Sequence, residues 1–216
     1  MKSLKPLRDD NLHHHVYHDD FMPTTAPLLN IEALTHGPIQ QLTFAWPAGV
    51  SWICGDEGTG KTTLLRLLAG DVQPLVGKVM APEGGVFWVD LQDKVHDTTT
   101  VQACWDALRT GWPHWNDALL QDLAHALDMH RHRDKRLHML STGSRRKVMV
   151  LAALASGAAV TLLDQPFAAL DLASIRIIQE FLHEAVDHPS RAWIVADFEA
   201  PREMPLAKVL NLDLSR

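Results

Sequence analysis

The stretch "GDEGTGKTT", Gly55 to Thr63, decides the fold predicted for this chain. It fits the pattern G-x-x-x-x-G-K-[ST], in which glycines let backbone N–H groups turn toward a bound anion. The apolar stretch "VSWIC" precedes it and the leucine-rich stretch "LLRLLAG" follows it, so a strand leads into the loop and a helix leaves it. This order predicts a nucleotide-binding α/β fold with a phosphate loop.

Each position of this loop is a candidate nucleotide-binding residue. The candidates are Gly55, Asp56, Glu57, Gly58, Thr59, Gly60, Lys61, Thr62 and Thr63. Lys61 is expected to reach the β- and γ-phosphates, and the Thr62 hydroxyl is expected to ligate Mg²⁺. The N-terminus of the following helix adds a partial positive charge, which also favours a bound phosphate.

A second stretch, "TLLDQPFAALD" from Thr161 to Asp171, predicts the rest of the site. An apolar strand ends in Asp164, and ligands of open α/β sheets bind at the carboxyl ends of the strands. Asp164 is therefore expected to hold Mg²⁺ through water, the alternative being an acid that caps the next turn. Gln165 stands where a nucleotide hydrolase is expected to carry a second carboxylate. An amide cannot accept a proton from water, and loss of a general base costs about 10²- to 10⁴-fold in rate.

Composition narrows the classes of protein. The chain has 216 residues, 46% of them hydrophobic, which fits one globular domain with a sizeable core. A net charge of −6 argues against nucleic-acid binding by a basic surface. Two distant cysteines, Cys54 and Cys104, fit a reducing compartment rather than a disulfide scaffold. The longest apolar run, Val148 to Leu163, is too short to span a bilayer and is interpreted as a buried helix leading into a strand.

Strands and helices alternate along the chain. Strands are predicted at Gln41–Ala45, Val50–Cys54, Gly77–Met80, Val86–Leu91, Val160–Leu163, Ala192–Ala196 and Lys208–Leu214, and helices at Lys61–Ala69, Ser144–Ser156 and Leu172–Val186. This alternation indicates an α/β fold with a mostly parallel central sheet. Residues 1–28 are polar and rich in histidine, without the apolar core of a signal peptide. They are interpreted as a loosely packed extension, with a metal-binding tail as the alternative.

The stretch "LSTGSRRK", Leu140 to Lys147, carries a resemblance to a known family. It resembles the signature L-S-G-G-Q of the ATP-binding cassette (ABC) family, the nucleotide-binding subunits of ABC transporters. Thr142 replaces a glycine of that signature and Ser144 replaces its glutamine. "AALD", Ala168 to Asp171, looks like the family's D-loop, and Gln92 looks like its Q-loop glutamine. Together with the phosphate loop and Asp164, these features follow the family's order over residues 31–200.

The resemblance implies a fold and a set of partners. The fold would be that of a P-loop NTPase with a mostly parallel central sheet, a small antiparallel β portion and a helical subdomain at about 98–145 of a domain spanning 29–216. Mg-ATP would close a head-to-tail dimer with a second copy or another ABC subunit. Ser141, Thr142 and Gly143 would contact the ATP held by the opposite subunit, and Gln92 would sense the γ-phosphate and ligate Mg²⁺. A membrane-embedded permease would be the further partner, which places the chain on the inner face of the cell membrane, in the cytoplasm.

Three positions depart from the family's pattern. Gln165 stands in place of the catalytic glutamate. Asp197 after the strand "AWIVA", or Ala196 in another register, stands in place of the switch histidine. His36 occupies the region of the aromatic residue that stacks on adenine. These changes predict that the chain binds ATP better than it cleaves it. The expected function is an ATP-binding transporter subunit with slow hydrolysis, and the alternative is a non-hydrolysing regulatory module.

Some residues receive two interpretations. Trp105, Trp112 and Trp115 could form a docking face for a partner or pack a small subdomain. The basic run Arg145–Lys147 is interpreted as a solvated helix face. The stretch Met129–His138 is interpreted as a solvated loop, with contacts to anionic lipid or a metal ion as alternatives.

Overall fold

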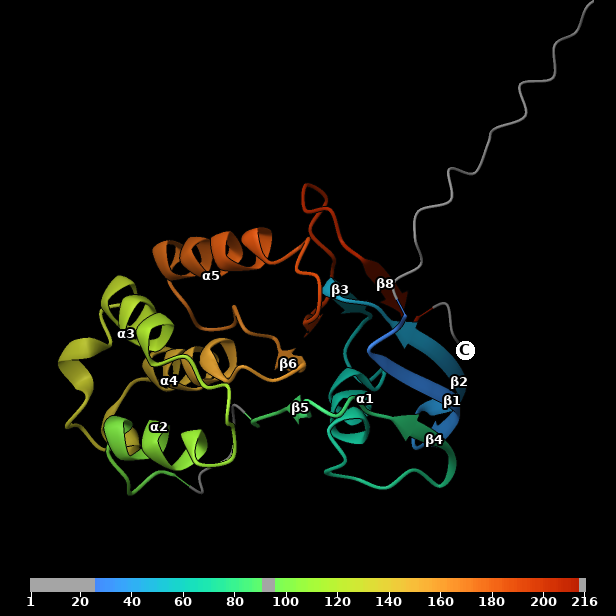
Figure 1. The fold of residues 1–216 in the computed structure, drawn as a ribbon, viewed down its shortest axis with the longest axis horizontal. Coiled ribbons are helices and arrows are strands. Elements are labelled where there is room, and N and C mark those ends of the chain that lie inside the picture. Colours follow the sequence, from blue (N-terminus) through green and yellow to red (C-terminus); the bar gives the residue numbers. More distant parts are fainter. Residues whose placement is uncertain (1–25, 91–95, 214–216) are drawn as a thin grey trace, which may run out of the picture.

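The computed structural model describes residues 26–90 and 96–213. The histidine-rich segment up to residue 25 and Gln92 lie outside the described residues. Figure 1 shows helices α2, α3 and α4 gathered at one end of the molecule, and strands β1, β2 and β4 with helix α1 at the other.

The central sheet is parallel and contains five strands in the order β5-β6-β7-β3-β8. The strands are β3 (Gly49–Cys54), β5 (Val86–Phe87), β6 (Val160–Asp164), β7 (Ala192–Ala196) and β8 (Lys208–Asn211). The sequence prediction of a mostly parallel α/β sheet is confirmed. The register pairs Ala196 with both Asp164 and Ile53, so β6, β7 and β3 end side by side. The residues that follow these strands therefore share one edge of the sheet.

Both faces of this sheet are covered. Leu163, Trp193 and Val195 pack in one hydrophobic cluster with helices α4 (Thr142–Ala155) and α5 (Leu172–Glu184). Their neighbours Leu162 and Ile194 belong to a second cluster with helix α1 (Lys61–Leu68). Successive side chains of a strand point to opposite faces, so strands buried on both faces carry continuous apolar sequence.

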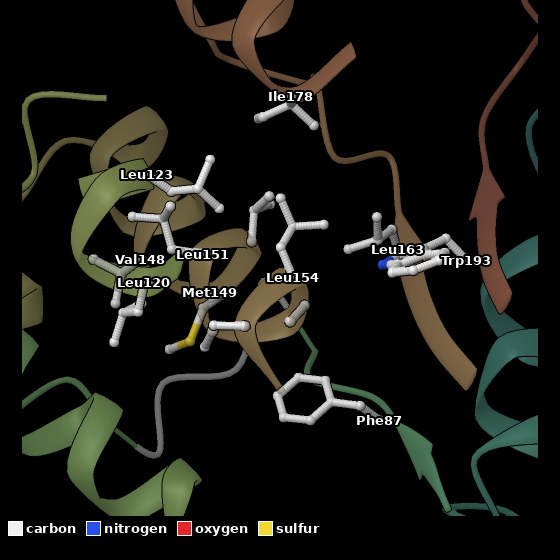
Figure 2. Close-up of a cluster of buried hydrophobic side chains, with 14 of the residues drawn as sticks. Phe87, Leu120, Leu123, Val148, Met149, Leu151, Leu154, Leu163, Ile178 and Trp193 are labelled. Atoms are coloured by element: carbon white, nitrogen blue, oxygen red, sulfur yellow. The ribbon is translucent and has the colours of Figure 1, made fainter. Parts of the chain in front are cut away.

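Helix α4 lies at the centre of the first cluster. Figure 2 shows Leu151 and Leu154 of α4 among Leu123 of α3, Ile178 of α5 and Leu163 of β6. Helix α3 spans Asp117–Ala126, and helix α2 spans Val101–Arg109. The apolar run from residue 148 to 163 is thus a buried helix leading into a buried strand, as the sequence predicts.

A second, antiparallel sheet has the strand order β2-β1-β4. Its strands are β1 (Leu29–His36), β2 (Ile39–Trp46) and β4 (Val76–Met80). The sequence analysis did not predict β1. Its pairing with β2 shifts register twice, and Ala33 has a φ of 47°, so the alternation of apolar and polar residues is broken. Strand β5 is also shorter than predicted, because it ends at Phe87.

The tryptophans of the helical region pack inward. Trp105 is 1% exposed, and its Nε1 donates a hydrogen bond of 2.9 Å to the Val148 carbonyl. The ring of Trp112 lies 5.2 Å from that of Phe87, and Trp115 packs against the same cluster. These contacts favour interior packing over a docking face for these three side chains.

The loop before the signature is partly buried. It includes two 3₁₀ turns, η1 (His130–His132) and η2 (Leu137–Met139), and Met129 and Leu137 are buried. Within residues 26–90 and 96–213, no three His, Cys, Asp or Glu side chains lie close enough together to hold a metal ion. In the same ranges, no helix combines the length and the apolar character needed to cross a membrane.

Trp105→Phe is expected to lower the free energy of unfolding by about 1–3 kcal/mol, because it removes a buried hydrogen bond along with part of a packed ring. Trp115→Phe is the matched control, since the buried Nε1 of Trp115 has no hydrogen-bond partner among the described residues. Urea unfolding of both variants measures the difference. Equal losses would show that the Trp105 hydrogen bond contributes nothing.

Candidate nucleotide-binding site

The phosphate loop connects β3 to α1 and is shaped by Gly60. This residue has a φ of 105°, which favours glycine, and a Cβ there would lie 2.7 Å from Pro38 Cγ. Helix α1 begins at the next residue and has no side-chain cap at its N-terminus. The first N–H groups of a helix lack partners within the helix, so an uncapped N-terminus suits a phosphate.

A pocket of about 330 Å³ opens at this loop. It is lined by Pro38, Glu57, Gly58, Gly60, Lys61, Thr62, Thr63, Asp164 and Gln165. The structure therefore brings most of the predicted loop together with both residues at the end of β6. Thr59 instead donates a hydrogen bond of 2.9 Å to the Asp56 carbonyl, which closes the loop on itself.

Lys61 lies beneath the loop. It is 5% exposed, and its Nζ donates to the carbonyls of Gly55 and Asp56, the latter at 2.7 Å. The same ammonium lies 4.9 Å from the centre of the Phe198 ring. A single positive charge is thus held at the wall of the pocket by two carbonyl oxygens and one aromatic face.

Thr62 and Asp164 join the loop to the sheet. The Thr62 hydroxyl donates a hydrogen bond of 2.6 Å to Asp164 Oδ2. Asp164 Oδ1 is buried and has no hydrogen-bond partner among the described residues. Burial raises the pKa of Asp164, while the Thr62 hydrogen bond and the Lys61 charge lower it. A hydroxyl and a carboxylate with an unpartnered oxygen are the hard ligands that Mg²⁺ takes, so these two residues fit that ion.

Gln165 follows β6 in an uncommon backbone conformation. Its φ is 45°, its N–H donates to the Ala196 carbonyl at 2.8 Å, and its carbonyl accepts from Arg146 Nη1 at 2.7 Å. Gln165 lines the pocket beside Asp164. The position predicted for the catalytic glutamate of the family is therefore next to the candidate metal ligand, and it carries an amide.

Asp197 follows β7, next to the end of β6. Its N–H donates to the Ile53 carbonyl at 3.0 Å, and its carboxylate accepts from the Phe198 N–H at 2.8 Å. Burial raises the pKa of Asp197, with that hydrogen bond and the charges of Lys61 and Arg146 opposing the effect. The carboxylate thus bonds back to its own chain, and Asp197 is not among the lining residues of the pocket.

His36 ends β1 and is also absent from the pocket lining, to which Pro38 of the same turn contributes. The Nδ1 of His36 is buried and has no hydrogen-bond partner among the residues described. The predicted contact of His36 with the base therefore stays a prediction.

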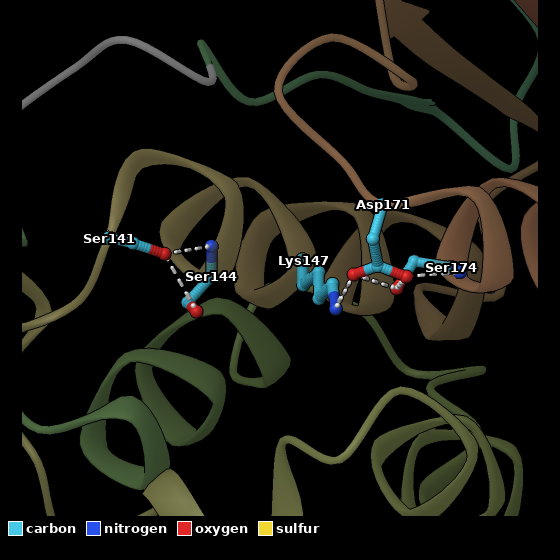
Figure 3. Close-up of polar contacts among 5 residues, drawn as sticks. All are labelled: Ser141, Ser144, Lys147, Asp171 and Ser174. Atoms are coloured by element: carbon cyan, nitrogen blue, oxygen red, sulfur yellow. Dashed lines mark hydrogen bonds and ion pairs between the residues drawn. The ribbon is translucent and has the colours of Figure 1, made fainter.

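The signature residues begin α4 and are not among the lining residues of the pocket in the same chain. Ser141 is the N-cap, and its Oγ accepts a hydrogen bond of 3.1 Å from the Ser144 N–H (Figure 3). A Cβ on Gly143 would lie 2.3 Å from the Ala169 carbonyl oxygen, so the signature packs directly on the D-loop. Asp171 caps α5 through the Ser174 N–H at 2.8 Å, and this bond together with Lys147 lowers the pKa of Asp171.

The prediction of a solvated basic face at residues 145–147 is wrong. Arg146 is 8% exposed and bonds to Gln165, Lys147 forms an ion pair of 3.0 Å with Asp171, and Arg145 pairs with Asp97. The sequence analysis missed Arg146 as a neighbour of the site. The available signal was its place on a helix whose following residues, from Val148, are continuously apolar, because such a helix is buried on most sides.

Comparisons with known proteins agree with this geometry. The profile of the family described as ABC transporter matches residues 39–168, which contain the phosphate loop, the signature and Asp164. The chain is 31% identical over 182 residues to the cobalt import ATP-binding protein CbiO of Rhodobacter capsulatus, a match that covers 73% of this chain and 65% of CbiO. It thus spans less than two thirds of that relative.

A second relative is matched over more of its length. The cytochrome c biogenesis ATP-binding export protein CcmA of Paramagnetospirillum magneticum is 31% identical over 189 residues, which covers 80% of this chain and 85% of CcmA. Among solved structures, an ABC transporter ATP-binding protein from Pyrococcus furiosus superposes with a TM-score of 0.69 at 23% identity, over 86% of this chain and 98% of that one. This last likeness establishes the fold.

The family profile covers more than half of the chain and the same segments that form the pocket and the signature. The fold, the order of the motifs and the two relatives agree with it. This chain therefore belongs to the ABC transporter family and is a nucleotide-binding domain of that family.

Proposed function

We propose that this chain binds Mg-ATP in the pocket at α1 and acts as the ATP-binding subunit of an ABC transporter. The observation that carries the proposal is the 2.6 Å contact between Thr62 and Asp164 beside the P-loop lysine. A hydroxyl, a carboxylate and an ammonium close to one pocket support the binding of a magnesium-bound polyphosphate. The names of both relatives describe ATP-binding proteins of import or export, which supports the same conclusion.

The residues of the pocket have separate roles in this proposal. Lys61 binds the β- and γ-phosphates, and the N–H groups of the loop and of the start of α1 bind phosphate oxygens. Thr62 and Asp164 hold Mg²⁺, with Gln92 as a third proposed ligand. Bound Mg²⁺ would neutralise charge on the β- and γ-phosphate oxygens. The Gln165 amide orients water near the γ-phosphate but does not take its proton.

The signature residues Ser141, Thr142 and Gly143 act on a nucleotide held by a second subunit. Exposed apolar side chains next to the signature and the D-loop support a surface for a second subunit. Met139, before the signature, is 63% exposed, and Leu172, after the D-loop, is 73% exposed. The partner is a second copy or another ABC subunit in a head-to-tail dimer. Closure of this dimer would be coupled to a membrane-embedded permease at the cytoplasmic side of the cell membrane.

The proposed domain division has two parts, the second of which contains a subdomain. Residues 1–28 form an extension, residues 29–216 form the ATP-binding domain, and residues of about 98–145 form its helical subdomain.

Slow hydrolysis follows from Gln165 and Asp197. The same two residues support the second candidate function, a regulatory module that binds nucleotide and closes without cleaving it.

Mg-ATP at about 100 times its Kd is expected to stabilise the protein by about 2.7 kcal/mol and to raise its melting temperature by about 5–10 °C. Lys61→Ala should abolish this shift, because it removes the charge at the wall of the pocket. Lys78→Ala is the control, since Lys78 forms an exposed ion pair with Glu32 on the antiparallel sheet. The measurement is the melting temperature of the wild type and both variants with and without millimolar Mg-ATP. A rise in melting temperature that is retained in Lys61→Ala would contradict the proposed binding site.

Gln165→Glu is expected to raise steady-state Mg-ATP turnover by about 10²-fold or more, because the glutamate restores a general base beside Asp164. The measurement compares phosphate release by the two purified proteins at saturating Mg-ATP. If turnover stays at the wild-type level although both proteins bind Mg-ATP, Gln165 does not limit the rate and the regulatory function is favoured.

A further inference from the structure

We propose that Arg146 is a positioning residue that holds Gln165 in the phosphate pocket through a hydrogen bond to the Gln165 carbonyl. This inference rests on the proposed function, because it concerns the residue that lies beside the candidate metal ligand. It adds a residue of the signature helix to the set that shapes the site of the same chain.

The backbone of Gln165 is held on both sides. Arg146 Nη1 donates to its carbonyl at 2.7 Å, and the Ala168 N–H donates to the same oxygen at 3.2 Å. On the other side, the Gln165 N–H donates to the Ala196 carbonyl of β7 at 2.8 Å. Of these three contacts, the one from Arg146 comes from a helix, so it ties the turn after β6 to α4.

Gln165 needs such support because of its backbone conformation. A φ of 45° lies in the left-handed region, which residues other than glycine seldom adopt and which persists only where surrounding contacts enforce it. Ala169 in the same turn has a φ of 61°. The position of Gln165 in the pocket lining depends on this conformation. Loss of the Arg146 contact would let the turn relax and move Gln165 relative to the pocket.

The surroundings of Arg146 explain how a buried cation is tolerated there. Arg146 is 8% exposed, and burial lowers its pKa, whereas the charges of Asp164 and Asp197 raise it. Two carboxylates of the site therefore offset the buried guanidinium. A buried charge without such neighbours is costly, so the placement of Arg146 depends on the acids that end β6 and follow β7.

Two further contacts join the same pair of segments. Gly143 packs on the Ala169 carbonyl, and Lys147 forms its ion pair with Asp171 (Figure 3). The first turns of α4 are thus fixed to residues 165–171 at three places, of which only Arg146 reaches the residue in the pocket.

The chain offers a matched control in Arg191. Its Nε donates a hydrogen bond of 2.8 Å to the Ala158 carbonyl, and its guanidinium lies 4.6 Å from the Trp193 ring. Burial lowers the pKa of Arg191 as well. Ala158 and Arg191 precede β6 and β7, so this contact lies at the opposite end of the two strands that lead to Asp164 and Asp197.

The experiment compares Arg146→Met, Arg146→Lys and Arg191→Met in the full chain by NMR. Without nucleotide, the amides of Gln165 and Ala168 should exchange with solvent about 10-fold faster or more in Arg146→Met, because a charge-assisted hydrogen bond to their turn is lost. Arg146→Lys should restore part of the protection, and Arg191→Met should leave these two amides at the wild-type rate.

A second readout uses nucleotide. The side-chain amide resonance of Gln165, identified by its loss in Gln165→Glu, should shift on addition of Mg-ATP in the wild type and in Arg191→Met. In Arg146→Met this response should disappear, although Mg-ATP still raises the melting temperature.

Wild-type exchange at Gln165 and Ala168 in Arg146→Met would overturn the inference. Equal acceleration in Arg191→Met would also overturn it, because the effect would then reflect general destabilisation. A failure of the proposed function looks different, since Mg-ATP would then leave the melting temperature of every variant unchanged. The exchange measurement without nucleotide would still decide the role of Arg146.

Discussion

The hydrogen bond between Thr62 and Asp164 is the contact on which the site depends. It connects the first turn of α1 to the last residue of β6, two segments far apart in the sequence. The contact exists because β6 and β3 both pair with β7 and end at the same level of a parallel sheet. The phosphate loop follows β3 at that edge, so the Thr62 hydroxyl lies next to the Asp164 carboxylate and donates a hydrogen bond to it. The lining of the pocket follows from this arrangement, as does the place of Gln165.

The parts of the fold that rest on local sequence were predictable. The phosphate loop, Asp164 and the buried helix before it depend on short patterns, because glycine spacing, strand ends and continuous apolar sequence act within a few residues. Strand β1 escaped prediction because a left-handed Ala33 and two register shifts interrupt its pattern. Its place next to β4, which lies far along the chain, stabilises a segment whose own sequence is weakly strand-like.

The prediction of a solvated face for the basic residues 145–147 was wrong for a different reason. Three successive charged residues read as solvent-exposed unless their partners are known, and those partners come from residues 97, 165 and 171. A sequence contains no local signal for such distant pairings. The apolar residues that follow Arg146 indicate a buried helix, but the contact between Arg146 and the Gln165 carbonyl became visible only in three dimensions.

In the proposed function, this site binds nucleotide and carries an altered hydrolytic residue. Thr62, Asp164 and Lys61 are the proposed ligands of a magnesium-bound polyphosphate, and the neighbouring Gln165 carries an amide. The most direct test of this account is calorimetric titration of ATP, with and without Mg²⁺, into the wild type and Thr62→Val. Mg²⁺ should strengthen ATP binding by about 10-fold or more in the wild type, which corresponds to about 1.4 kcal/mol, and by less than about 2-fold in the variant. An equal gain from Mg²⁺ in both proteins would contradict the account, because Thr62 would then not help to hold the ion.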